Sequence, residues 1–132
     1  MKKITTIILS TACAFAVGSA FADLTIVNKS ASDSTMLIKG MCTAENLILK
    51  AQRKNITKSG QTNSYNDTLV AMACGGESGT CKADLYAADN CDNSNDMIGT
   101  GELNLDTKTV KIDSLVSGHD VQASGSTITI NK

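Results

Sequence analysis

The chain has 132 residues, with twelve basic and thirteen acidic side chains and a formal net charge of −1. It contains two tyrosines, two phenylalanines and no tryptophan. The lack of a basic excess argues against nucleic acid as a partner, and the shortage of aromatic rings leaves little material for base-stacking or sugar-stacking surfaces.

The first 22 residues have the three parts of a secretory signal peptide. Two lysines give a positive start, residues 4–17 are largely apolar, and Ala20 and Ala22 supply the small side chains that a signal peptidase requires. The apolar stretch is shorter than the roughly 20 residues of a membrane-spanning helix, so we expect cleavage after Ala22 and no transmembrane segment afterwards. A lipoprotein signal ending at Cys13 is the alternative. We predict a bacterial protein exported to the periplasm, the outer envelope or the medium.

Residues 23–132 have the length of a single domain. They contain short β-type runs separated by Gly, Asn, Asp and Ser. In residues 81–87 small or apolar side chains alternate with polar ones, which is the period of a strand with one buried face. A helix is indicated only at residues 113–116, for one turn, and residues 58–67 are polar. The predicted strands are residues 24–27, 35–39, 46–51, 54–57, 68–74, 81–87, 97–105 and 109–113, then Val121 with residues 126–130 as a final edge or closing strand.

Eight or nine short strands cannot all lie in one flat sheet that has a core on one side only. Two packed sheets or a barrel would bury both sets of inward side chains. We therefore predict an all-β fold, a small disulfide-stapled β-sandwich of about eight short antiparallel strands, with a small β-barrel as the second choice.

Four cysteines remain after the expected cleavage: Cys42, Cys74, Cys81 and Cys91. An even number in a small exported domain predicts two disulfides, and no Cys-x-x-Cys spacing typical of zinc or redox sites occurs. A strand that begins at Cys81 would carry the chain about 20 Å away, which makes a bond from Cys81 to Cys91 hard to form. Cys74 and Cys81 flank a glycine-rich turn, so we predict the pairs Cys74–Cys81 and Cys42–Cys91.

The loop of residues 89–96 places oxygen donors at alternating positions, as in the first half of a calcium-binding loop. The sharp-turn glycine is missing, and Gly101 stands where the bidentate glutamate belongs. The alternative is a polar loop whose Asn and Asp side chains cap its own backbone. The weak calcium candidates are Asn90, Asp92, Ser94 and Asp96.

The only histidine, His119, lies in a short polar segment with Ser117 and Asp120. These three residue types make up a hydrolase triad, but neighbours within one turn do not reach the geometry that a triad needs. We expect a turn here rather than a catalytic site.

Basic residues are concentrated in one part of the chain. Residues 39–58 contain five basic side chains and one acid, Glu45, whereas residues 59–132 contain ten acids and four basic residues. We interpret the basic segment as a docking patch for an acidic partner or an anionic envelope surface, with ordinary solvated strand faces as the alternative. The patch consists of Lys39, Lys50, Arg53, Lys54 and Lys58.

No motif in the sequence indicates catalysis or a cofactor. We expect a non-catalytic envelope or secreted binding module, such as an accessory subunit of an envelope or secretion assembly or a surface interaction protein, with a protein partner. One alternative is an inhibitor of a host or secreted enzyme. The other is a small secreted hydrolase in which paired carboxylates act as acid and base. Its candidate carboxylates are Asp84, Asp89, Asp92 and Asp96.

Overall fold

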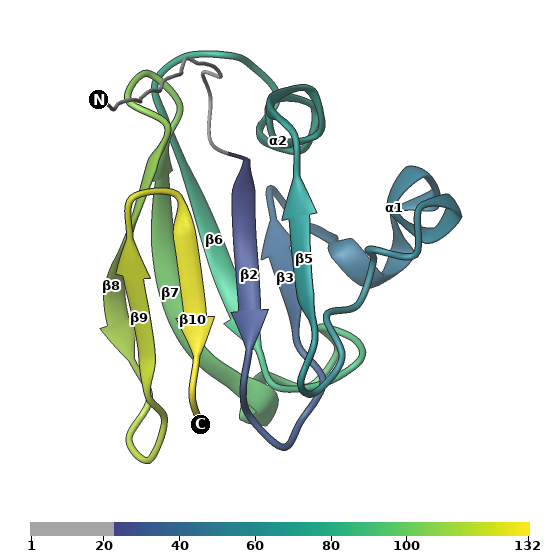
Figure 1. Cartoon of the computed structure of the whole chain (residues 1–132), viewed down its shortest axis with the longest axis vertical. Helices are drawn as coiled ribbons and strands as arrows, with labels where there is room; N and C mark the ends of the chain where they lie inside the picture. The colour runs from purple at the N-terminus through teal and green to yellow at the C-terminus, as the bar shows by residue number, and fades with distance from the viewer. Residues whose placement is uncertain (1–22) are drawn as a thin grey trace, which may run out of the picture.

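The computed structural model describes residues 23–132, and the predicted signal peptide lies outside the described residues. Two sheets pack face to face (Figure 1). The four-stranded sheet has the strand order β5 (Thr62–Tyr65), β2 (Leu24–Asn28), β10 (Thr127–Ile130) and β9 (Val121–Ser124). The five-stranded sheet has the order β4 (Met41–Cys42), β3 (Thr35–Ile38), β6 (Thr80–Tyr86), β7 (Met97–Asn104) and β8 (Thr109–Leu115).

All strand pairs are antiparallel except β2 with β10, which run parallel. On one side the two sheets approach each other, and the Val110 amide in β8 donates to the Gly125 carbonyl before β10 at 2.9 Å. On the other side an isolated bridge joins Ser34 to Thr57. The sheets do not close into a barrel, and the predicted β-sandwich is confirmed.

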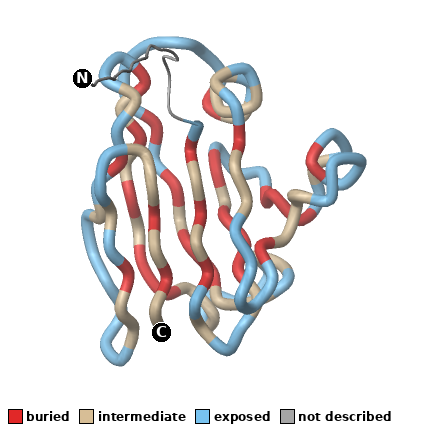
Figure 2. Tube along the Cα trace, viewed as in Figure 1, coloured by how far each residue is buried: buried red, intermediate tan, exposed pale blue. Residues whose placement is uncertain are grey.

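The core lies between the two sheets, where alternate residues of each strand point inward (Figure 2). In β2, for example, every second residue is buried, as the period of a half-buried strand requires. The most deeply buried large apolar side chains are Ile26, Leu85, Ile98, Ile128 and Ile130.

Two segments that the sequence analysis predicted as strands, residues 46–51 and 68–74, are helices instead. They form α1 (Leu47–Ala51), which follows the short 3₁₀ helix η3 (Thr43–Glu45), and α2 (Asp67–Cys74). Asn46 and Asn66 act as N-caps, and each side-chain oxygen accepts a backbone hydrogen bond of 3.0 Å from the residue three positions later. Short apolar runs fit strands and helices equally well, and these caps decide for the helix.

Several other boundaries also differ from the prediction. β8 continues to Leu115, so the helical turn expected at residues 113–116 is wrong. Residues 54–57 contribute only the isolated bridge of Thr57, while part of the polar stretch forms the edge strand β5. The predicted final strand is two strands: Val121 begins the edge strand β9, and β10 lies between β2 and β9. A 3₁₀ helix, η4 (Ser94–Asp96), precedes β7.

Within residues 23–132 no helix has the length and apolar character needed to cross a membrane.

Candidate functional site

One disulfide fastens α2 to the five-stranded sheet, and the other fastens the edge strand that precedes α1. The Cys42–Cys91 bond joins β4, shortly before α1, to the loop between β6 and β7. The Cys74–Cys81 bond joins the last residue of α2 to β6. These are the pairs that the sequence analysis predicted, although the glycine-rich turn connects a helix to a strand rather than two strands.

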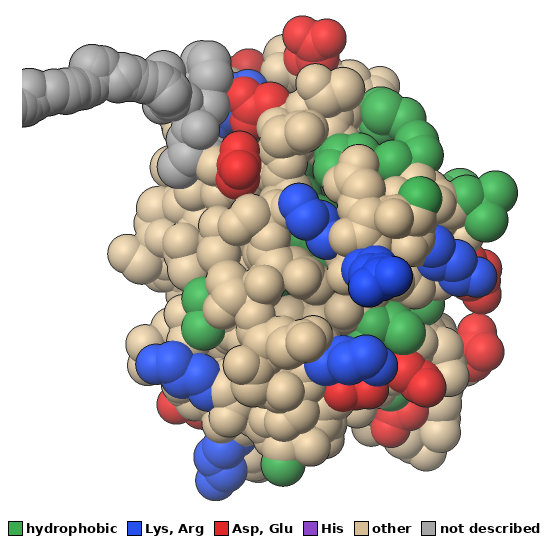
Figure 3. Space-filling view, turned by 45° about the vertical axis from the view of Figure 1, so that its right-hand side comes forward, with side chains coloured by type: hydrophobic (Ala, Val, Ile, Leu, Met, Phe, Trp, Pro, Cys, Tyr) green, Lys and Arg blue, Asp and Glu red, His purple; other side chains and the backbone are tan. Residues whose placement is uncertain are grey.

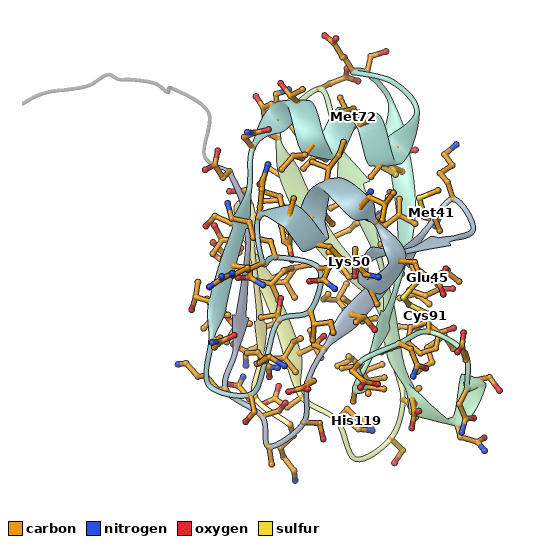
Figure 4. The ribbon with its side chains drawn as sticks, turned by 90° about the vertical axis from the view of Figure 1, so that its right-hand side faces the viewer. Met41, Glu45, Lys50, Met72, Cys91 and His119 are labelled. Atoms are coloured by element: carbon orange, nitrogen blue, oxygen red, sulfur yellow. A yellow bond between two sulfur atoms is a disulfide. The ribbon has the colours of Figure 1, made fainter. Side chains whose placement is uncertain are left out.

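Large apolar side chains are exposed on the side of the molecule that carries α1 and α2. Leu47, the first residue of α1, is 77% exposed. This short helix buries only the side chain of Leu49. Figure 4 shows Met72 on α2 and Met41 at the start of β4 on the same side. Met41, Leu47, Ile48 and Met72 are here called the apolar surface.

Part of the apolar surface adjoins a small hollow between the two helices. Ile48 and Met72 both line a cavity of about 40 Å³, together with buried side chains such as Leu49. The shared cavity places α1 beside α2 and brings Ile48 and Met72 to its lining. Figure 3 shows hydrophobic side chains gathered in this part of the molecule, with Lys and Arg side chains next to them.

Four members of the predicted basic patch come from the segment that contains α1. They are here called the cationic group: Lys39, Lys50, Arg53 and Lys54. None of the four forms an ion pair with another described residue. The fifth member, Lys58, belongs to a separate turn, in which the Gly60 amide donates to the Asn28 carbonyl at the end of β2. Four of the five predicted residues therefore come from the chain around α1, and Lys58 does not.

Two residues of the cationic group have left-handed backbone conformations. Lys39 has φ of +54° in the two-residue hairpin between β3 and β4, and Arg53 has φ of +59° just after α1. The Arg53 amide donates to the Lys50 carbonyl at 3.0 Å and the Lys54 amide to the Leu49 carbonyl at 2.8 Å, which is the hydrogen-bond pattern of a Schellman motif. Glycine or asparagine is the usual residue at both kinds of position.

The buried side chain of Tyr65 forms a hydrogen bond with the backbone that follows α1. The Tyr65 hydroxyl in β5 donates to the Lys54 carbonyl at 2.9 Å and lies 3.4 Å from the Thr57 hydroxyl. Burial raises the pKa of Tyr65, and the side-chain hydrogen bonds with Thr57 and Asn63 act in the opposite direction. This contact links the four-stranded sheet to the segment that carries the cationic group.

A larger cavity, of about 640 Å³, lies next to this hollow along α2, and Val70 and Met72 line both. Its apolar lining includes Val70, Leu103 and Leu105, and the ion pair between Lys108 Nζ and Asp67 Oδ2, at 3.6 Å, lies at its wall. The volume falls in the range of about 300–1,000 Å³ that small-molecule sites occupy. Because the paired charges largely cancel, the cavity offers mainly an apolar surface to a ligand.

The weak calcium candidates take part in local turns. The Asn90 side-chain oxygen accepts from the Asp92 amide at 3.0 Å, and Ser94 and Asp96 belong to η4. Thr35 holds the loop by donating to the Asn90 carbonyl at 3.1 Å. Among residues 23–132, no three His, Cys, Asp or Glu side chains are grouped so that they could hold a metal ion.

The residues of the triad-like segment do not contact one another through their side chains. His119 Nδ1 lies 3.3 Å from the carbonyl of Lys132, and the Asp120 carboxylate accepts a 3.4 Å hydrogen bond from the Asn131 amide group. Both contacts tie the turn to the C-terminal residues.

The candidate hydrolase carboxylates lie away from both cavities. Asp84 is a half-buried residue of β6, and Asp89, Asp92 and Asp96 belong to the loop between β6 and β7. None of them lines either of the two cavities described above.

The sequence analysis missed the apolar surface altogether. Leu47, Ile48 and Met72 lay in runs that were predicted as strands, where such residues would have been buried. The usable signals were the N-cap residues Asn46 and Asn66 (in the second case with Gly75 at the other end of the helix), which together indicate helices.

Taken together, the fold and this surface define a small disulfide-bonded β-sandwich protein with an exposed apolar and cationic side. Over residues 1–132 the chain matches the protein family described as "T2SS substrate NttC". It therefore belongs to the NttC family of type II secretion system substrates, and it is a secreted bacterial protein, which confirms the predicted export.

A solved structure agrees with this assignment at the level of the fold. The crystal structure of the Legionella pneumophila type II secretion system substrate NttC is similar, with a TM-score of 0.64 and 22% sequence identity. The similarity covers 86% of this chain and 99% of that one. Comparison with curated proteins gives no match.

Proposed function

We propose that this protein is a non-catalytic secreted binding protein, and that the apolar surface and the cationic group together form its contact site. The observation that carries the proposal is the pairing of four exposed large apolar side chains with four cations that have no ion-pair partner among residues 23–132. Exposed apolar groups that are rimmed by polar residues are typical of interaction sites.

The rigid attachment of this side supports the proposal. One disulfide holds β4, which carries Met41, and the other holds the end of α2, which carries Met72, so these two contact side chains are presented on fixed supports. Preorganised side chains lose less conformational entropy when they bind. An inhibitor of another protein would be one form of such a binding protein.

The test measures binding of the secreted, oxidised protein to intact cells of the producing bacterium and of a eukaryotic line. The double variant Met41→Ser/Leu47→Ser removes two exposed apolar side chains and should abolish most of the saturable binding. The matched control is Leu115→Ser/Val116→Ser, which removes two large apolar side chains that are 44% and 41% exposed at the end of β8. The proposal is overturned if the wild-type protein shows no saturable binding, or if the two double variants bind equally well.

A further inference from the structure

We propose that the contact site binds an anionic phospholipid bilayer, with Leu47 and its apolar neighbours inserted among the lipids and the cationic group on the headgroup phosphates. This inference rests on the proposed function and deepens it, since it names the chemistry of the target. Peripheral membrane binding of this kind combines buried apolar side chains with electrostatic attraction to anionic lipids.

The first argument is the shape of the site. The segment with α1 stands out from the side of the sandwich in Figures 1 and 2, and Leu47 is the most exposed large apolar residue of the described chain. A protruding apolar side chain can enter a fluid bilayer without a pre-formed pocket. A folded protein partner would need a matching cavity for each protruding side chain.

The second argument is the backbone conformation of the cations. Among residues 23–132, three non-glycine residues have positive φ, and all three are basic: Lys39, Arg53 and Lys108. Two of them belong to the cationic group. Because glycine or asparagine would adopt these conformations more easily, unfavourable backbone geometry at these two sites suggests that the positive charge is required there.

The third argument is the distribution of charge. In the sequence, the cationic group lies in a segment, residues 39–58, that contains one acid, Glu45, while residues 59–132 carry ten acids and four basic residues. An anionic bilayer would repel most of the remaining surface and attract the α1 side. The field of the protein would therefore orient it with Leu47 towards the lipid.

The main experiment uses a fluorescent reporter of insertion. The chain has no tryptophan, so Leu47→Trp creates a single indole at the tip of the site, and Leu115→Trp creates one at an exposed apolar position elsewhere. The probes are vesicles of phosphatidylglycerol mixed with phosphatidylcholine and vesicles of phosphatidylcholine alone. We expect a blue shift of emission for Leu47→Trp with the anionic vesicles only, and no shift for Leu115→Trp with either.

Vesicle sedimentation then tests the cations. Lys39→Asn/Lys50→Gln should weaken binding to the anionic vesicles by roughly 25-fold, at about fivefold for each cation. Asparagine is chosen at position 39 because it tolerates positive φ. The control Lys82→Gln/Lys111→Gln removes the same net charge from another face and should bind like the wild-type protein. At about 1 M salt, where the screening length is about 3 Å, the difference should largely disappear.

The outcomes separate this inference from the proposed function. If the protein binds cells through the apolar surface but the Leu47→Trp emission does not shift with anionic vesicles, the lipid inference is overturned and an acidic protein is the target. An equal shift with both vesicle types, or equal weakening by the two lysine pairs, also overturns it. If Met41→Ser/Leu47→Ser leaves binding to cells unchanged, the proposed function itself fails.

Discussion

The side that carries the helices and the outer face of the five-stranded sheet handle charge in opposite ways. On the sheet face Lys82 contacts Glu102 at 3.6 Å and Asp113 at 3.2 Å, and Lys111 contacts the same two acids at 3.5 and 3.9 Å. Each cation there has acidic neighbours across the strands. On the side with α1, the four residues of the cationic group have no ion-pair partner in the described chain and stand beside exposed apolar side chains.

This difference shows why the number of charges alone does not locate a contact site. Paired charges on a sheet face satisfy one another and present a nearly neutral surface to a partner. Unpaired cations beside apolar side chains leave both charge and apolar area available for binding. The two faces also differ in how they are held, because disulfides fasten the helical side and a regular β-ladder builds the other.

The largest effect should come from removing the disulfides that hold the helical side. Cys42→Ala/Cys91→Ala opens a bond between residues 49 positions apart, and Cys74→Ala/Cys81→Ala opens one between residues 7 positions apart. Chain-entropy estimates predict losses of about 4 and about 2.5 kcal/mol in the free energy of unfolding. Denaturant titration of both double variants measures the two losses. Equal losses would show that loop length does not control the contribution of these bonds.

Tyr65→Phe should weaken the support of α1 by about 1–2 kcal/mol, because the Lys54 carbonyl loses its hydroxyl donor. The pH dependence gives a second measurement. The pKa of Tyr65 is raised in the folded state, so its contribution is complete below the unfolded pKa of about 10 and is lost as pH rises through the folded pKa. The variant should therefore lose less stability above pH 10 than the wild-type protein. A parallel decline in both would exclude Tyr65 as the cause.

Arg53→Gly should stabilise the protein by about 0.5–1 kcal/mol, since glycine adopts the left-handed conformation after α1 without strain. The same change removes one cation and should weaken the binding of anionic vesicles. Thermal melting and vesicle sedimentation on the same sample measure the two effects. A variant that is both more stable and equally good at binding would show that Arg53 contributes nothing to the contact site.

Lys82→Gln should have the smallest effect, because this lysine lies on the exposed, ion-paired face. The contacts with Asp113 and Glu102 raise the pKa of Lys82, so they help the folded state below the unfolded lysine pKa and the help fades as pH rises through the folded pKa. We expect the denaturation midpoint to move little and to approach the wild-type value at high salt. A large shift that salt does not reduce would mean that the sheet face depends on Lys82 for packing.

The sequence by itself determined the features that depend on local pattern or covalent chemistry. The period-2 alternation in β6 predicts a half-buried strand wherever that segment lies, and four cysteines in an exported domain predict two disulfides. The limit on reach from Cys81 to Cys91 removed one of three pairings, and the glycine-rich turn between Cys74 and Cys81 selected the pairing that the structure also contains. Export followed from the first 22 residues, and family membership supports it independently.

Only the tertiary structure decided which residues of the short apolar runs are exposed. The segments around Leu49 and Met72 fit either a strand or a helix, and N-caps together with packing against the sheets made both helical. The parallel pairing of β2 with β10, and the lack of an ion-pair partner for the cationic group among residues 23–132, likewise depend on residues far apart in the chain. The physical reason is that burial and charge pairing are set by neighbours in space, which local sequence patterns do not specify.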